Sequence, residues 1–154
     1  MLYSYRQATW KLGDFGLAAE GTSKRVQTSR YARGTASYRA PELVKDGKFN
    51  NKVDIWAMGC ILFEVVFRKK AFDNDTAVYD YSLQNRFFGE MIDIPYDAGI
   101  FPGETFHHSI QNLIHGMLEV EFQKRPSANE LLRAFEILST GLLGSIDVTY
   151  NSNQ

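Results

Sequence analysis

The chain has 154 residues, 44% of them hydrophobic, and a formal net charge of −1. This length suits one domain with a sizeable core, and the hydrophobic content argues against a disordered chain. The near-zero charge argues against a nucleic-acid-binding protein, whose surface is usually strongly basic. The single cysteine, Cys60, cannot form an internal disulfide and suits a reducing compartment.

The first forty residues predict a small hairpin followed by a long loop. Leu2 to Tyr5 and Thr9 to Leu12 are strand-like, with Arg6-Gln7 between them. From Gly13 to Ala40 the chain is rich in Gly, Ser and Thr and has no apolar period. Loops of this length in a compact domain are usually functional or disordered.

The stretch from Asn51 to Arg68 predicts the central helix, after a short helix that begins at Pro41 and ends at Gly47. Its apolar residues occur at nearly every angle of a helical period, so we expect protein to cover it on all sides. Lipid is an unsuitable cover, because two charged residues interrupt the apolar run. Either Asn50 or Asn51 is expected to cap the helix, and Asp54 to lie at the positive end of its dipole.

A further helix is predicted from Thr76 to Phe88 with Asp75 as its cap, and an irregular connection from Met91 to Glu104. Two helices then close the fold. The first has an amphipathic pattern at Ile110, Leu113, Ile114, Met117 and Leu118. The second begins with a capping box between Ser127 and Glu130. Its inward face is expected to consist of Leu131, Leu132, Phe135 and Leu138.

These elements predict a mainly α fold, a helical bundle around a central buried helix with at most one short β-hairpin at the N-terminus. The domain is expected to cover residues 1–145, and residues 146–154 to form a frayed tail. Three histidines, His107, His108 and His115, have no cysteine or carboxylate at ligand spacing, which argues against a metal site among them.

Four motifs follow one another in a specific order and spacing. They are Asp14-Phe15-Gly16, Ala40-Pro41-Glu42, Asp54-Ile55-Trp56 with Gly59, and Arg125-Pro126-Ser127. In this order the chain resembles the C-terminal lobe of a eukaryotic protein kinase of the serine/threonine type, from about residue 9 to residue 140. The resemblance implies a kinase-like C-lobe fold and, for the parent enzyme, ATP-dependent phosphoryl transfer to protein Ser or Thr.

The resemblance implies ATP and Mg²⁺ as cofactors. Asp14 resembles the carboxylate that holds magnesium on the β and γ phosphates of the nucleotide, and a hard cation prefers such oxygen ligands. Phe15 would pack inward and set the orientation of that carboxylate, and Gly16 would supply backbone freedom for the turn.

Residues 17–39 resemble an activation segment, which phosphorylation orders in this family. Thr35 stands where serine/threonine kinases keep a threonine near the catalytic aspartate, and Thr28, Ser29 and Tyr31 lie where activating phosphates usually occur. Four basic residues either pair with such a phosphate or form a solvated loop. They are Arg25, Arg30, Arg33 and Arg39.

Structural roles are implied for five further residues. Glu42 and Arg125 resemble a buried ion pair that ties the end of the activation segment to the helices. Asp54 resembles the acid that anchors the backbone of the catalytic loop, and Trp56 and Gly59 fit the same helix.

The departures from the family concern catalysis. Met1 stands where an Asn ligand for the second metal is usual, and the sequence contains no His-Arg-Asp loop, Gly-rich loop or ATP-binding Lys. We therefore expect a truncated kinase domain that is inactive alone, its missing half supplied in a longer product. The alternatives are a non-catalytic module that binds proteins through residues 76–88 and the loop near Thr35, or a gene product with no role.

As partners we expect a protein substrate or binding protein, and neither nucleic acid nor a membrane. The expected location is intracellular, in the cytoplasm or the nucleus.

Overall fold

A computed structural model of the chain describes residues 2–11, 13, 15, 16, 18, 19, 21, 22, 24–29, 34–84 and 103–150. In chain order its elements are β1 (Leu2–Ser4), β2 (Thr9–Lys11), β3 (Gln27–Thr28), η1 (Ala36–Tyr38), α1 (Pro41–Asp46), β4 (Lys48–Phe49), α2 (Lys52–Phe67), α3 (Asp75–Gln84), α4 (Glu104–Met117), η3 (Phe122–Lys124) and α5 (Ala128–Tyr150). The expected mainly α fold is confirmed.

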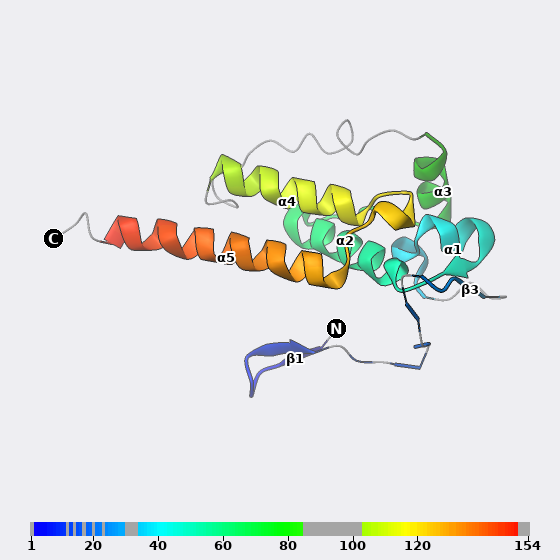
Figure 1. Ribbon diagram of the computed structural model, residues 1–154, viewed down its shortest axis with the longest axis horizontal. Coiled ribbons are helices and arrows are strands. Elements are labelled where there is room, and N and C mark those ends of the chain that lie inside the picture. The colour runs from blue at the N-terminus through cyan, green and yellow to red at the C-terminus, as the bar shows by residue number, and fades with distance from the viewer. Residues whose placement is uncertain are drawn as a thin grey trace.

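Figure 1 shows α2 in the middle of the helical body, with α4 beside it and with α1 and α3 together at one end. The long α5 continues past the other end of the body, and the hairpin of β1 and β2 lies below the helices. None of the described helices combines the length and the apolar character that crossing a bilayer requires.

The core forms where α2, α3, α4 and the start of α1 meet. Its buried side chains include Trp56, Cys60, Phe72, Val78 and Ile114. A smaller cluster joins α2 and α4 to α5 through Ile55, Met117 and Leu131. The amphipathic pattern predicted for α4 is confirmed, because its apolar stripe supplies residues to both clusters.

The expectation that α2 is covered on all sides is wrong for the part of the chain that the structure describes. Met58 is 47% exposed and Val65 is 71% exposed, and Asp54 is exposed as well. These three residues recur at helical spacing and so lie along one face of α2. The elements that contact α2 pack on the opposite side, where Trp56 and Cys60 are buried.

Helix ends follow the predicted caps with one exception. At the start of α2, Asn51 holds the N-cap position without a side-chain cap bond, and the Oδ1 of the preceding Asn50 accepts the backbone N–H of Lys52 at 2.9 Å. For α3 the predicted cap, Asp75, is wrong. The preceding Asn74 accepts the N–H of Ala77 at 3.0 Å, which satisfies one of the helix's free donors. The range expected for this helix ran to Phe88, but residues 85–102 lie outside the described part.

The helix α5 opens with the predicted capping box. The Ser127 N–H donates to Glu130 Oε2 at 2.7 Å, and the Glu130 N–H donates to Ser127 Oγ at 3.3 Å. Leu131 is buried, but Leu132 is 58% exposed, so its assignment to the inward face is wrong. Successive residues of an α-helix are rotated by about 100° around its axis, so Leu132 points away from the face on which Leu131 is buried. The helix continues to Tyr150, beyond the boundary predicted at residue 145, and residues 151–154 are not described.

The strands of the described residues form two short antiparallel pairings. The predicted hairpin is confirmed, with Leu2 opposite Lys11 and Tyr3 opposite Trp10. The second pairing, between β3 and β4, exceeds the single hairpin that the sequence predicted. It attaches the segment before residue 30 to the connection between α1 and α2.

Candidate functional site

The predicted metal ligand, Asp14, and one predicted phosphate acceptor, Tyr31, lie outside the described residues. Arg30 and Arg33 also lie outside them. Among the described residues, no three His, Cys, Asp or Glu side chains come together as a metal site would need. Because Asp14 itself lies outside the described residues, its fit to the role of magnesium ligand stays a prediction.

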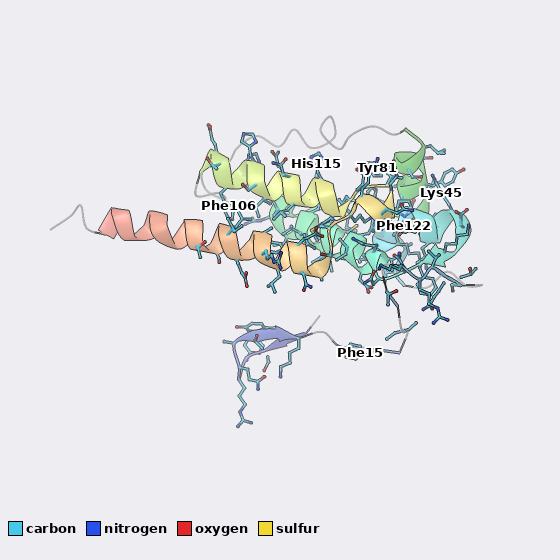
Figure 2. All side chains as sticks on the ribbon, in the orientation of Figure 1. Phe15, Lys45, Tyr81, Phe106, His115 and Phe122 are labelled. Carbon is cyan, nitrogen blue, oxygen red and sulfur yellow. The ribbon has the colours of Figure 1, made fainter. Side chains whose placement is uncertain are left out.

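Phe15 does not pack inward as predicted. Its side chain is 69% exposed, and Figure 2 places it on the thin stretch between the hairpin and the helices, away from the helical body. Neither described core cluster includes it. Gly16, its neighbour, lies in a turn that the Ala18 N–H closes by donating to the Phe15 carbonyl at 3.0 Å.

The described part of the predicted activation segment is attached to the helices at two places. At the first, β3 pairs with β4, and the Ser29 N–H donates to the Gly47 carbonyl at 2.8 Å. Gly47 has φ of +62°, and a Cβ there would lie 2.6 Å from the Ser29 carbonyl oxygen. Only glycine suits this position, because the left-handed turn and the close approach of the chain both exclude a side chain.

At the second place, Arg39 joins the segment to the start of α3. Its guanidinium pairs with Asp75 at 2.5 Å and donates twice to the Gly34 carbonyl, at 2.9 and 2.6 Å. Ser37 also donates to the Asp73 carbonyl at 2.9 Å. Thr35 lies exposed between these contacts. Arg39, one of the four basic residues considered for a phosphate, is thus already held by a carboxylate.

The side chains of Glu42 and Arg125 form the ion pair expected from the sequence, across 83 residues of chain. The two guanidinium ends donate to the two carboxylate oxygens at 2.8 and 2.7 Å. Three further bonds from Arg125 reach backbone carbonyl groups, those of Lys52, Glu119 and Val120. A guanidinium can be buried without loss of hydrogen bonds only when its donors are used in this way.

Trp56 lies against the Arg125 side of this pair. The guanidinium carbon of Arg125 is 5.0 Å from the centre of the Trp56 rings, and Phe72 stacks on Trp56 at 5.3 Å. A cation over an indole face is favourable, most of all when both groups are desolvated. Among the described residues, the buried Nε1 of Trp56 has no acceptor.

Gly59 allows α2 and α4 to pack closely. A Cβ at this position would lie 2.8 Å from the Cβ of Met117 and 3.0 Å from a methyl carbon of Leu118. Such a distance is too short for a side chain, so glycine is required here despite its cost within a helix. The next residue, Cys60, is buried, and burial raises the pKa of its thiol to about 12, which makes it a packing residue and not a nucleophile.

Asp54 lies in the first turn of α2 on the exposed face. Partial desolvation of its carboxyl group raises its pKa above the ordinary value. Hydrogen bonds from backbone N–H groups and the positive end of the helix dipole would both lower this pKa, so desolvation outweighs them at Asp54. Its predicted role as anchor of a catalytic loop remains a prediction.

Sequence reasoning missed two contacts at this site. It considered Arg39 as a phosphate ligand or as part of a solvated loop, and it assigned Asp75 to a cap. It also gave no partner for Tyr38, whose hydroxyl donates to Glu64 Oε2 at 2.6 Å, a bond that raises the pKa of Tyr38. Each pair joins elements far apart in the chain, so a single sequence offers no local pattern that would reveal it.

Comparison with known proteins identifies relatives over most of the chain. The protein kinase domain family matches residues 1–135. Serine/threonine-protein kinase Nek1 of Mus musculus is 31% identical over 133 residues, which cover 85% of this chain and 10% of Nek1. Nek5 of Homo sapiens is 33% identical over 123 residues, 80% of this chain and 16% of Nek5. Nek3 of Oryza sativa subsp. japonica is 37% identical over 127 residues, 80% of this chain and 19% of Nek3. The chain thus covers less than a fifth of the length of each of these three relatives.

Proposed function

We propose, on the premise that this chain belongs to the protein kinase family, that it is the C-terminal lobe of a serine/threonine kinase domain. The parent reaction is transfer of the γ-phosphoryl group of ATP to a Ser or Thr hydroxyl of a protein substrate. One observation carries the proposal: the Glu42–Arg125 ion pair, 2.7 Å long, joins two motifs that the family resemblance selects. It lies against Trp56, a residue of the third motif.

Within this proposal the chain supplies two parts of the phosphoryl-transfer machinery. Asp14 would hold Mg²⁺, which when bound neutralises charge on the phosphates during transfer. Residues 34–39, fixed by Arg39 and by the pair at Glu42, would form the surface that receives the substrate. Thr35 favours Ser or Thr as the phosphate acceptor, since it stands at the position that distinguishes serine/threonine kinases. We also propose that this kinase acts inside the cell, in the cytoplasm or the nucleus.

The exposed face of α2 supports a lobe that is completed by further protein. Asp54, Met58 and Val65 form a stripe with an acid at its start, on the helix that anchors the core. The proposed partner is the other half of a kinase domain, carried in a longer product, which would cover this stripe and contribute the catalytic base. These 154 residues contain no His-Arg-Asp sequence, so we propose that they do not transfer phosphate by themselves.

A radiolabel assay tests the proposal in two arms. The 154-residue chain alone should transfer no phosphate from ATP to a general Ser/Thr substrate above the buffer blank, and calorimetry should detect no heat of Mg-ATP binding. The same residues preceded by a kinase N-terminal half should transfer phosphate to Ser or Thr. Transfer by the chain alone, unchanged by Asp14→Asn and free of contaminating kinases, would contradict the assignment of roles.

A second candidate function is a non-catalytic module that binds a protein partner. Tyr79 and Leu83 favour it, because they are exposed and lie one turn apart on α3, next to the Arg39–Asp75 contact. Two large apolar side chains on one exposed face are a common feature of protein docking surfaces. If this is the function, Tyr79→Ala with Leu83→Ala should abolish partner binding, while Asp14→Asn should leave it unchanged.

A further inference from the structure

The exposed face of α2 runs the whole length of the helix and has a charge at each end. The positions on this face follow one another at steps of four, three, four and three residues, which keeps them within about 80° of arc. They are Asp54, Met58, Ile61, Val65 and Arg68, the last being the residue that caps the helix, and we call them the α2 stripe. Trp56 and Phe63, which are buried in the core, lie on the opposite side of the helix.

The described elements leave the α2 stripe largely uncovered. Met58 is 47% exposed and Val65 is 71% exposed, and Ile61, between them, belongs to neither described core cluster. Asp54 and Arg68 are both exposed, and neither forms an ion pair with another described residue. An apolar centre bordered by charges is the usual composition of a surface that binds another protein.

The order of residues along the α2 stripe favours a second copy of the chain as the partner. Ile61 is equally far from both ends, so Asp54 and Arg68 each lie about 10 Å from it along the helix axis. When two copies of α2 pack antiparallel around a two-fold axis at Ile61, Asp54 of each copy lies level with Arg68 of the other. Met58 of each copy lies within about 1.5 Å of the level of Val65 of the other, so apolar residues also meet. A two-fold interface requires this reciprocity, because the same patch contacts itself.

We propose that two copies of this chain pair through the α2 stripe as an antiparallel dimer with two-fold symmetry. Each copy contributes Met58, Ile61 and Val65 to an apolar centre, and two Asp54–Arg68 ion pairs close its ends. The dimer removes apolar side chains from water and gives each exposed charge a partner of opposite sign. The face of one helix buries less area than a stable interface does, so the dimer is weak and reversible.

This dimer goes beyond the proposed function, which assigns the same face of α2 to the other half of a kinase domain. The two occupants exclude one another, so the residues joined to a kinase N-terminal half should not pair through the α2 stripe. The test of the dimer measures mass and needs no phosphate transfer. Failure of the dimer and failure of the proposed function can therefore be told apart.

Sedimentation equilibrium of the full chain at low salt tests the dimer. Over about a hundredfold range of protein concentration, the average mass should rise from 17.6 kDa toward twice that value and no further, as mass action requires. Val65→Lys should weaken the association about tenfold or more, because it buries an unpaired charge in the apolar centre. Ile137→Lys is the matched control, since Ile137 is also 71% exposed but lies on α5, and it should leave the association unchanged.

Reversal of the end charges tests the antiparallel order of the pairing. Asp54→Arg and Arg68→Asp should each weaken the association about tenfold or more, because like charges then face each other across the interface. Aspartate suits position 68, since it tolerates the φ of +53° that the chain has there. The double variant restores opposite charges and should recover most of the association. Urea unfolding of each variant checks that it is folded.

The proposal is overturned by a mass that stays at the monomer value at every concentration, or by one that rises past the dimer. It is also overturned when single charge reversals weaken the association and the double variant does not recover it. A monomeric chain that binds a separately added kinase N-terminal half, and loses this binding in Val65→Lys, would show that the half covers the α2 stripe and a second copy does not.

Discussion

At the scale of single residues, the contact between Glu42 and Arg125 decides most about the fold. The guanidinium is fully buried and gives its donors to one carboxylate and three carbonyl groups. Such pairs gain little over an apolar replacement, because desolvation nearly cancels their attraction. They do fix geometry, because any other arrangement leaves a buried charge without a partner. The ion pair therefore holds the end of the predicted activation segment in one position relative to α2.

The account predicts how removal of each partner affects stability. Glu42→Ala should lower the free energy of unfolding by about 3 to 5 kcal/mol, because it leaves a buried cation unpaired. Glu42→Leu with Arg125→Met should cost less than the sum of the two single changes, by about 1 to 3 kcal/mol. Urea unfolding of the two single variants and the double variant closes the cycle. Strict additivity would show that the two groups do not interact.

Asp54 gives a second prediction, which depends on pH. Its pKa is raised in the folded chain by desolvation, so the folded state binds its proton more tightly than the unfolded state does. Stability from this group therefore falls as pH rises from the unfolded pKa through the folded one. Asp54→Asn should raise the unfolding midpoint at neutral pH, and the gain should vanish in acid.

The matched control for this prediction is Asp80→Asn, which removes the same charge from an exposed position on α3. If both changes have the same effect at every pH, the desolvation of Asp54 is not the cause. If Asp54→Asn destabilises the chain at neutral pH, favourable contacts of the carboxylate outweigh its desolvation.

At the scale of elements, the approach of α2 to α4 depends on Gly59. Gly59→Ala gains about 1 kcal/mol of helix propensity but creates a clash with Met117 and Leu118, and overpacking typically costs about 1 to 3 kcal/mol. We expect a net loss of stability in thermal and urea unfolding. In Gly116→Ala, within α4, the new methyl would meet only a Pro126 carbon at 3.8 Å, so this control should be neutral or stabilising. A stabilised Gly59→Ala would mean that the helices are less tightly packed.

The start of α5 gives another prediction that depends on pH. Hydrogen bonds from Ser127 lower the pKa of Glu130 in the folded chain. Stability from this group is therefore present above its unfolded pKa of about 4.3 and is lost as pH falls through the folded value. The unsubstituted chain should lose stability relative to Glu130→Gln over this acid range. Circular dichroism melts between neutral and acid pH measure the difference, and parallel curves would contradict it.

These elements also explain how far the sequence could predict the fold. The capping box, the asparagine at the start of α2 and the stripe on α4 depend on residues within two turns of each other, and all were predictable. The β3–β4 pairing and the exposure of Phe15 depend on segments that are distant in sequence. Apolar character alone could not show that α2 has an open face, since it does not say which neighbours are present.

At the scale of the whole molecule, α2 divides the described structure into a packed side and an open side. The packed side carries the core and the buried ion pair, and the open side presents Asp54, Met58 and Val65. The predicted site residues are likewise divided. Glu42 and Arg125 form the ion pair that the family resemblance implied. Arg125 also contacts Trp56, which was not predicted, and Phe15 does not join them. The motifs were predictable as a set because their order and spacing are specific. Their contacts were predictable only through the resemblance.

The central claim is that these residues form the half of a serine/threonine kinase domain that holds the metal and the substrate. The most direct measurement is a radiolabel assay on a kinase domain in which they follow an N-terminal half with a Gly-rich loop and a His-Arg-Asp loop. The account predicts phosphate on Ser or Thr and a loss of about 10²-fold or more in Asp14→Asn, since catalysis depends on charge stabilisation by several groups. Full activity in the Asp14→Asn domain, or phosphate on tyrosine only, would contradict it.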